Sequence, residues 1–194
     1  MGQASTERPD WNRLFMTAQV QDGLFTTQQA AEAGYSPQLL VHHVHGGRVL
    51  RVRRGIYRLA HYPAGTQEEL VAAWLWSERA GVVSHETALS LHGLSDALPS
   101  HLHLTLPSDW RQRRFRVPAD VVLHYADIPS EDRAWSGAVP TTNPRRSLND
   151  CASAGLSPEL LRQAAQQALY RGLVVKAELG SVEQALAPFG GLAT

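Results

Sequence analysis

Basic side chains gather in two short segments of a chain that carries no net charge. The 18 lysines and arginines balance the 18 aspartates and glutamates, yet no acidic residue lies between Glu32 and Glu68. Guanidinium groups bind phosphate oxygens, so a face that collects them without acids is suited to nucleic acid. The arginines of the acid-free stretch are Arg48, Arg51, Arg53, Arg54 and Arg58, and those of the second segment are Arg111, Arg113, Arg114 and Arg116.

Three short helices are expected ahead of the first arginine segment. Apolar residues recur at helical spacing in residues 12–21, and Thr26 or Thr27 is expected to cap a second helix that runs through Ala33 and ends at Gly34. Ser36 followed by Pro37 predicts a third helix, since a capping residue and then a proline at the first helical position is the favoured order. Glycines 46 and 47 are expected to end that helix.

Residues 49–59 predict a β-hairpin rather than a fourth helix. Apolar and basic residues alternate on both sides of Arg54 and Gly55, and a glycine there can take the positive φ that a tight turn requires. Leu50 and Val52 are expected to face the core, which leaves the arginines of that strand on its outer side.

Helices followed by an arginine-bearing hairpin form the layout of a winged helix-turn-helix, which we expect over residues 11–62. A helix fits the major groove of DNA, and residues near its N-terminus reach the base edges. Gln38 is the candidate base reader because its amide can bond adenine bidentately, while the hairpin arginines are expected to contact phosphates or enter the minor groove. A winged helix that serves only protein contact is the alternative. The candidate DNA-contacting residues of the third helix are Ser36, Gln38, His42 and His45.

Residues 66–190 predict a second domain that mixes helices and strands, so the fold class expected for the chain is α+β. The expected helices cover residues 66–80, 85–92, 143–152 and 157–171, with a short one from 176, and the expected strands cover 101–106, 121–125 and 138–142. The second arginine segment lies in the loop between the first two of these strands, where it is expected to add DNA contacts.

Two pairs among the nine histidines share a face at close spacing: His42 with His45 on a helix, and His101 with His103 on a strand. No cysteine or carboxylate pattern completes a tetrahedral set at either place. Polar surface is therefore the favoured interpretation, and neither a metal nor a cofactor is expected. The single cysteine, Cys151, predicts a buried thiol in a reducing compartment.

Sequence motifs for catalysis are not found, so an enzyme is not expected. Ser84, His85 and Glu86 have suitable chemistry, but three consecutive residues of a helix cannot converge on one substrate. Phosphate-binding loops and nucleophile elbows are absent from the sequence. No apolar run approaches the roughly 20 residues needed to cross a bilayer, and the polar N-terminus is unlike a signal peptide. A cytoplasmic protein without membrane contact is expected.

Several segments together resemble the AbiEi-type antitoxins, which are the antitoxin and transcriptional-regulator half of type IV toxin–antitoxin systems. The resemblance extends from about residue 11 to 186, and its most specific parts are the hairpin and the Ser-His-Glu segment. The segments that carry it are Gly23–Ala30, Leu50–Leu59, Val83–Leu94, Pro140–Asp150 and Ala168–Leu173.

The resemblance implies binding to inverted repeats in the chain's own promoter, with two copies on the DNA and repression of the operon. It also implies neutralisation of a nucleotidyltransferase-like toxin encoded alongside, and DNA contact through the positive residues of the second domain. One alternative is an antitoxin that blocks its toxin by direct contact, with DNA binding secondary. Another is the regulatory front part of a Vsr-like nuclease, a domain that similar segments precede in related proteins.

Overall fold

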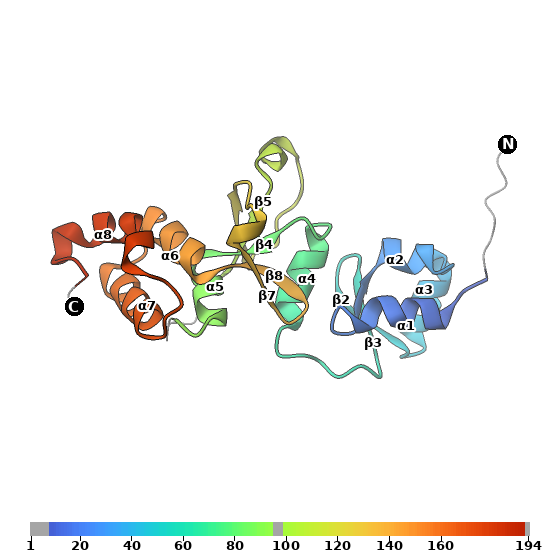
Figure 1. The fold of residues 1–194 in the computed structure, drawn as a ribbon. Helices are drawn as coiled ribbons and strands as arrows, with labels where there is room; N and C mark the ends of the chain where they lie inside the picture. Colours follow the sequence, from blue (N-terminus) through green and yellow to red (C-terminus); the bar gives the residue numbers. More distant parts are fainter. Residues whose placement is uncertain (1–7, 95–98, 193–194) are drawn as a thin grey trace. The chain divides into compact units, whose positions relative to one another are not determined.

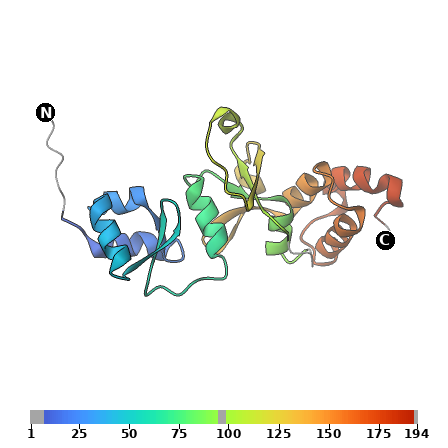
Figure 2. The same ribbon diagram turned by 180° about the vertical axis from the view of Figure 1, so that it is seen from behind.

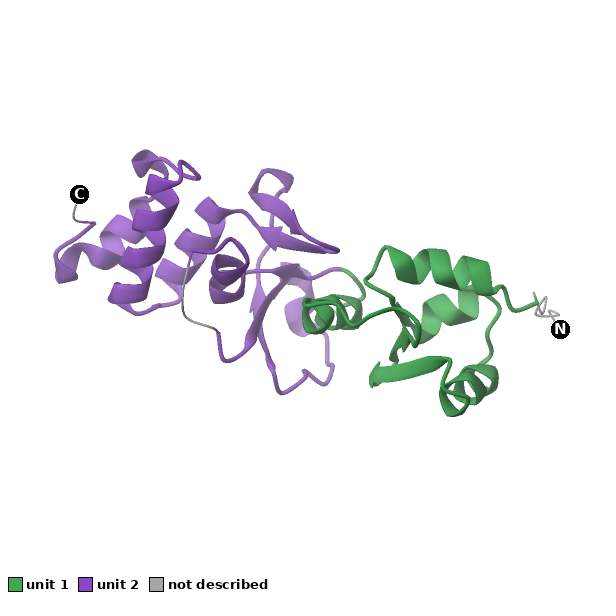
Figure 3. Cartoon of the chain, turned by 90° about the horizontal axis from the view of Figure 1, so that it is seen from below, with its two compact units in different colours: residues 1–79 green, residues 80–194 purple. Residues whose placement is uncertain are grey.

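The computed structural model describes residues 8–94 and 99–192 (Figure 1). The chain divides into two compact units, Met1–Arg79 and Ala80–Thr194, which Figure 3 colours separately. Both units combine helices with a β-sheet, in agreement with the expected α+β class. Within the described residues, no helix is both long enough and apolar enough to span a membrane.

Unit 1 begins with three short helices, each started by a polar side chain that satisfies an otherwise unpaired backbone N–H. Helix α1 covers Trp11–Gln19, α2 covers Thr27–Glu32 and α3 covers Pro37–His45. Thr26 and Gln29 form a reciprocal capping box at α2. These positions agree with the helices expected from the sequence to within two residues at each end.

The sheet of unit 1 has three antiparallel strands in the order β1-β3-β2. Strand β1 covers Leu24–Thr26, β2 covers Val49–Arg53 and β3 covers Ile56–Leu59. The hairpin between β2 and β3 turns at Gly55, whose φ of 78° lies in the left-handed region that glycine adopts without steric cost. The expected hairpin is therefore confirmed.

The residue that this hairpin buries differs from the expected one. Val49 is 1% exposed and Leu50 is 40% exposed, so the prediction that Leu50 faces the core was wrong. Val49 lies opposite the buried Leu59, and Leu50 lies opposite Arg58 on the other side of the pleat. The prediction assigned the residues of this strand to the wrong faces, because a shift of one residue exchanges the two faces of a strand.

Helix α4, Glu68–Trp76, belongs to unit 1 rather than to the second domain where the sequence placed it. Strand β1 turns Phe25 toward the cluster formed with α1, α2 and α3 and turns Leu24 the other way. Helix α4 contacts β1 and β3 and supplies buried residues such as Val71 and Leu75. Figure 1 shows α1 to α3 on one side of this sheet and α4 on the other. Because both faces of the sheet are apolar, the second face also needs a helix to cover it.

Unit 2 contains a five-stranded mixed sheet in the order β6-β5-β4-β8-β7. Strands β5 and β6 are parallel, as are β4 and β8, while β4 with β5 and β7 with β8 are antiparallel. The short strands β4 and β7 were not expected from the sequence. The strands are β4 Val82–Val83, β5 Leu102–Leu106, β6 Val121–Tyr125, β7 Arg133–Ser136 and β8 Val139–Thr142.

Four α-helices accompany this sheet in the described part of unit 2, and Figure 2 shows three of them, α6, α7 and α8, gathered at one end of the unit. Their apolar faces enclose a core that includes the fully buried Leu148, Cys151 and Leu161. The helices are α5 His85–Leu91, α6 Pro144–Ser153, α7 Pro158–Tyr170 and α8 Gly180–Leu186, with 3₁₀ turns at Ser108–Gln112, Ser130–Asp132, Lys176–Glu178 and Ala187–Phe189.

Candidate nucleic-acid interface

Helix α3 turns one polar face outward. Gln38, Val41, His42 and His45 follow the spacing that brings side chains to one side of a helix, and all four are exposed. Leu40 on the opposite side is only 2% exposed and anchors the helix in the core of unit 1. The structure therefore brings together three of the four candidate residues of this helix on a single accessible surface.

The remaining histidine of this helix is part of the packing. The His43 ring lies 6.0 Å from the Trp11 ring and 5.5 Å from the Tyr35 ring, measured between centroids. Burial lowers the pKa of His43, and the nearby charge of Arg48 lowers it further. His43 therefore packs against aromatic side chains of unit 1 and does not belong to the exposed face of α3.

Ser36, the fourth candidate, is the N-cap of α3. Its Oγ accepts a hydrogen bond of 3.2 Å from the backbone N–H of Leu39. One lone pair of the hydroxyl is thus used to start the helix, while the hydroxyl hydrogen remains a donor that an acceptor such as a phosphate oxygen can use. Ser36 is exposed, so a ligand can approach it.

The tip of the hairpin is tied to the N-terminus of α2. The backbone N–H of Thr27 donates to the carbonyl oxygen of Gly55 at 2.9 Å, and the Thr27 hydroxyl donates to the same oxygen at 3.3 Å. These bonds join two segments far apart in the sequence and hold the arginine beside the turn, Arg54, at a defined place. Arg48, Arg51 and Arg54 are exposed, whereas Arg53 is half-buried.

Arg58 does not belong to the exposed set. Its side chain is 16% exposed, and its Nε lies 3.2 Å from Oε2 of Glu68 on α4. Arg58 also donates from a terminal nitrogen to the carbonyl oxygen of Tyr62. The sequence pattern could not reveal this ion pair, because it placed Glu68 in a different domain.

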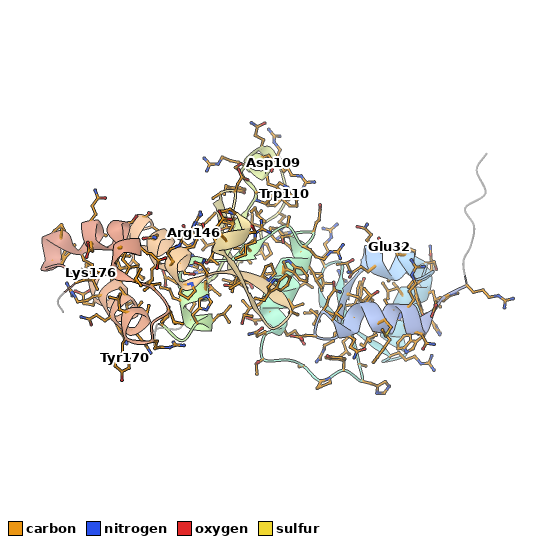
Figure 4. All side chains as sticks on the ribbon, in the orientation of Figure 1. Glu32, Asp109, Trp110, Arg146, Tyr170 and Lys176 are labelled. Atoms are coloured by element: carbon orange, nitrogen blue, oxygen red, sulfur yellow. The ribbon has the colours of Figure 1, made fainter. Side chains whose placement is uncertain are left out.

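The second arginine segment occupies the loop between β5 and β6, where Figure 4 labels Asp109 and Trp110. The Arg113 guanidinium lies 3.8 Å from the centre of the Trp110 ring, and that of Arg111 lies 5.6 Å from the Tyr125 ring. Aromatic faces thus fix two of these cations in place. All four arginines of this segment, Arg111, Arg113, Arg114 and Arg116, are exposed.

Three histidines that the sequence pattern did not connect lie together in unit 2. They are His85, His103 and His124, and one ring nitrogen from each lies within 4.8 Å of the chosen nitrogens of the other two. The three residues come from α5, β5 and β6, so no short spacing links them. The available signal was that both predicted strands, 101–106 and 121–125, contain histidine, which a parallel pairing can bring to the same face of the sheet.

Unit 1 belongs to the class of small α+β modules. Its helix α3 exposes one polar face, and an arginine-bearing hairpin follows this helix in the chain. Residues 12–60 match the model of the family described as "Transcriptional regulator, AbiEi antitoxin". The resemblance to AbiEi-type antitoxins is thereby confirmed over these residues, which hold α2, α3, the whole hairpin and all of α1 except Trp11.

The chain was also compared with curated proteins and with solved structures. No curated protein matches the chain. Among solved structures, the chain is similar to one titled "Crystal structure of RV2827C protein from Mycobacterium tuberculosis", with 15% sequence identity and a TM-score of 0.48, covering 97% of this chain and 80% of that chain. A likeness at this score supports no conclusion about function.

Proposed function

We propose that the chain is a transcriptional regulator that binds double-stranded DNA through unit 1. The observation that carries the proposal is the exposed face of α3 in a unit that also exposes Arg48 directly before the hairpin and Arg51 and Arg54 within it. In this proposal α1 to α3 and the hairpin act as a winged helix-turn-helix. The family description of residues 12–60 supports the regulatory role.

The two parts of this interface have different tasks. The α3 face enters the major groove, where Gln38 reads adenine and His42 and His45 contact bases or phosphates. The hairpin arginines bind the phosphate backbone, which supplies affinity with little sequence information. Arg114 and Arg116 of unit 2 add further contacts of the same electrostatic kind.

The test is a salt titration of DNA binding by the full chain, using the DNA upstream of its own gene and fluorescence anisotropy. Arg51→Glu combined with Arg54→Glu is expected to weaken binding strongly and to reduce the log–log salt dependence by about 2 units, since each lost phosphate contact removes roughly 0.9. Arg133→Glu with Lys176→Glu makes the same charge change in unit 2, on exposed residues that the proposal does not assign to the DNA interface. This control is expected to bind like the unchanged protein, and equal losses in both double variants would contradict the proposed interface.

We further propose that the chain acts as an antitoxin toward a nucleotidyltransferase-like toxin encoded beside it. The family description supports this role. Co-expression with the neighbouring gene tests it: the unchanged chain is expected to restore growth. If the Arg51→Glu, Arg54→Glu variant also restores growth while failing to bind DNA, antitoxicity depends on protein contact rather than on repression.

A further inference from the structure

The histidine cluster of unit 2 is built by three separate elements. His85 is the first residue of α5, His103 lies in β5 and His124 lies in β6. Strands β5 and β6 are parallel neighbours, with His103 opposite Val122. Since His124 follows Val122 by two residues, both strand histidines lie on the same face of the sheet.

The distance between the His103 and His124 ring nitrogens is close to the distance between two nitrogen ligands of a tetrahedral metal ion. Nδ1 of His103 lies 3.0 Å from Nε2 of His124. A tetrahedral zinc ion with Zn–N bonds of about 2.0–2.1 Å places its ligand nitrogens roughly 3.3 Å apart. The His85 ring stacks on the His124 ring at a centroid distance of 3.5 Å, and one ring nitrogen from each of the three histidines lies within 4.8 Å of the other two.

Neighbouring groups hold the His85 ring in the way that outer-shell groups hold metal ligands. Nδ1 of His85 lies 2.9 Å from Oγ of Ser84, which accepts a hydrogen bond of 2.7 Å from the Thr105 hydroxyl. When Nδ1–H donates to the Ser84 hydroxyl oxygen, the neutral ring keeps the lone pair on Nε2, which can then bind a metal. His85 also has a φ of 52°, a strained backbone conformation for a residue other than glycine, and such strain is concentrated at functional sites.

The surroundings keep these imidazoles neutral, which is the form that binds metals. Burial lowers the pKa of His85 to about 3 and that of His124 to about 4, and it also lowers the pKa of His103. Arg146, whose charge acts on His85, is paired with Asp132 and Asp150, so its charge is largely compensated.

The cluster borders a pocket of about 350 Å³ whose wall includes His85, His124, Arg111 and Asp150. Oδ2 of Asp150 is buried and has no hydrogen-bond partner among the described residues. An unsatisfied buried acceptor usually has a water, an ion or a ligand as its partner. A water bound to a metal can fill this role, because it donates hydrogen bonds readily.

We propose that His85, His103 and His124 bind one divalent transition-metal ion of the zinc class, with a fourth position open to water in this pocket. Three histidines and an open position form the ligand pattern of catalytic rather than structural zinc sites. The sequence alone favoured polar surface histidines and no metal. This site goes beyond the proposed DNA binding and does not depend on it.

Metal binding is measured on the full chain by equilibrium dialysis against zinc, with the bound metal counted by mass spectrometry. One zinc per chain is expected. His103→Gln and His124→Gln are each expected to weaken binding by about 100-fold or more, and Ser84→Ala by about 10-fold. His101→Gln is the matched control, because His101 is exposed and lies two residues from His103 on the same face of the chain.

A second measurement uses the unchanged protein, so that it holds even if a variant fails to fold. Nitrogen NMR of the imidazole rings is expected to show that zinc shifts the resonances of His85, His103 and His124 together and leaves that of His101 in place. Cobalt(II) is expected to give the visible absorption of a four-coordinate ion. The proposal is overturned if zinc binds equally well to His101→Gln and His124→Gln, or if the three rings do not respond to it.

Discussion

Arg54 and Arg58 lie four residues apart in one hairpin, yet they have different surroundings. Arg54 is exposed beside the turn, while Arg58 faces Glu68 at 3.2 Å and is mostly covered. In the sequence alone, both arginines contribute equally to the positive charge of the segment. Only the exposed one has a charge that a phosphate can approach, so the proposed DNA contacts of the hairpin rest on Arg48, Arg51 and Arg54.

At the residue scale, Gln38→Ala is expected to reduce sequence discrimination rather than overall affinity. Loss of one bidentate base contact costs about 1–3 kcal/mol against the preferred base pair, while binding to unrelated DNA stays the same. Competition binding with single-base variants of the operator measures this effect. A uniform loss on all sequences would instead place Gln38 at the phosphate backbone.

The histidine cluster predicts a pH dependence of stability in metal-free protein. His85 and His124 have pKa values of about 3 and about 4 when folded, against about 6.5 when unfolded, so the unfolded chain binds more protons between these values. Their contribution is fully present above about pH 6.5 and is lost as the pH falls toward 4 for His124 and toward 3 for His85. After allowance for partial solvent access, the expected loss of unfolding free energy is on the order of 2 kcal/mol.

Urea unfolding across this pH range, with a chelator present, measures that loss. The charged and titratable groups around the cluster include Arg146, Glu86 and His101, which also act on its histidines. His124→Gln is expected to flatten the pH profile, and His101→Gln is expected to preserve it. A profile that His124→Gln leaves as steep as before would assign the dependence to other groups.

At the element scale, helix α4 is the last helix of unit 1, which therefore extends beyond the predicted boundary at residue 62. Leu24 and Ile56 are 0% and 3% exposed, and both lie on the sheet face opposite the core formed by α1, α2 and α3. Without α4, that face would meet water. Burying each large apolar side chain is worth about 1.5–3 kcal/mol, so one helix contributes a large part of the unit's stability.

A fragment of residues 8–79 is therefore expected to unfold cooperatively, and a fragment of residues 8–65 to be less stable by several kcal/mol or largely unfolded. Thermal unfolding followed by circular dichroism compares the two fragments. Equal melting temperatures would show that the covered face of the sheet does not need α4.

At the scale of the whole molecule, regulation through inverted repeats predicts two copies of the chain per operator. Half-sites are expected about 10–10.5 base pairs apart or at multiples of this spacing, because both copies then approach the same side of the helix. Analytical ultracentrifugation on operator DNA should give two chains per duplex. Inserting half a helical turn between the half-sites is expected to weaken binding if the copies touch, and to leave it unchanged if they bind independently.

Much of the fold could be predicted because its signals are local. Polar caps such as Ser36, the helical spacing of apolar residues and the glycine at the hairpin turn each act within a few positions of the chain. The same local signals led to the α3 face and to the exposed hairpin arginines. Strands β4 and β7 escaped prediction because each is short and is stabilised by neighbours distant in sequence.

The sequence by itself determined the α+β class, the three N-terminal helices, the hairpin and the charge asymmetry that suggested DNA. The tertiary structure decided which side chains remain accessible: it paired Arg58 with Glu68, buried Val49 in place of Leu50 and assigned α4 to unit 1. It also brought His85, His103 and His124 together. Local patterns are set by backbone preference and periodicity, whereas accessibility and convergence depend on strand register and on packing between segments far apart in the chain.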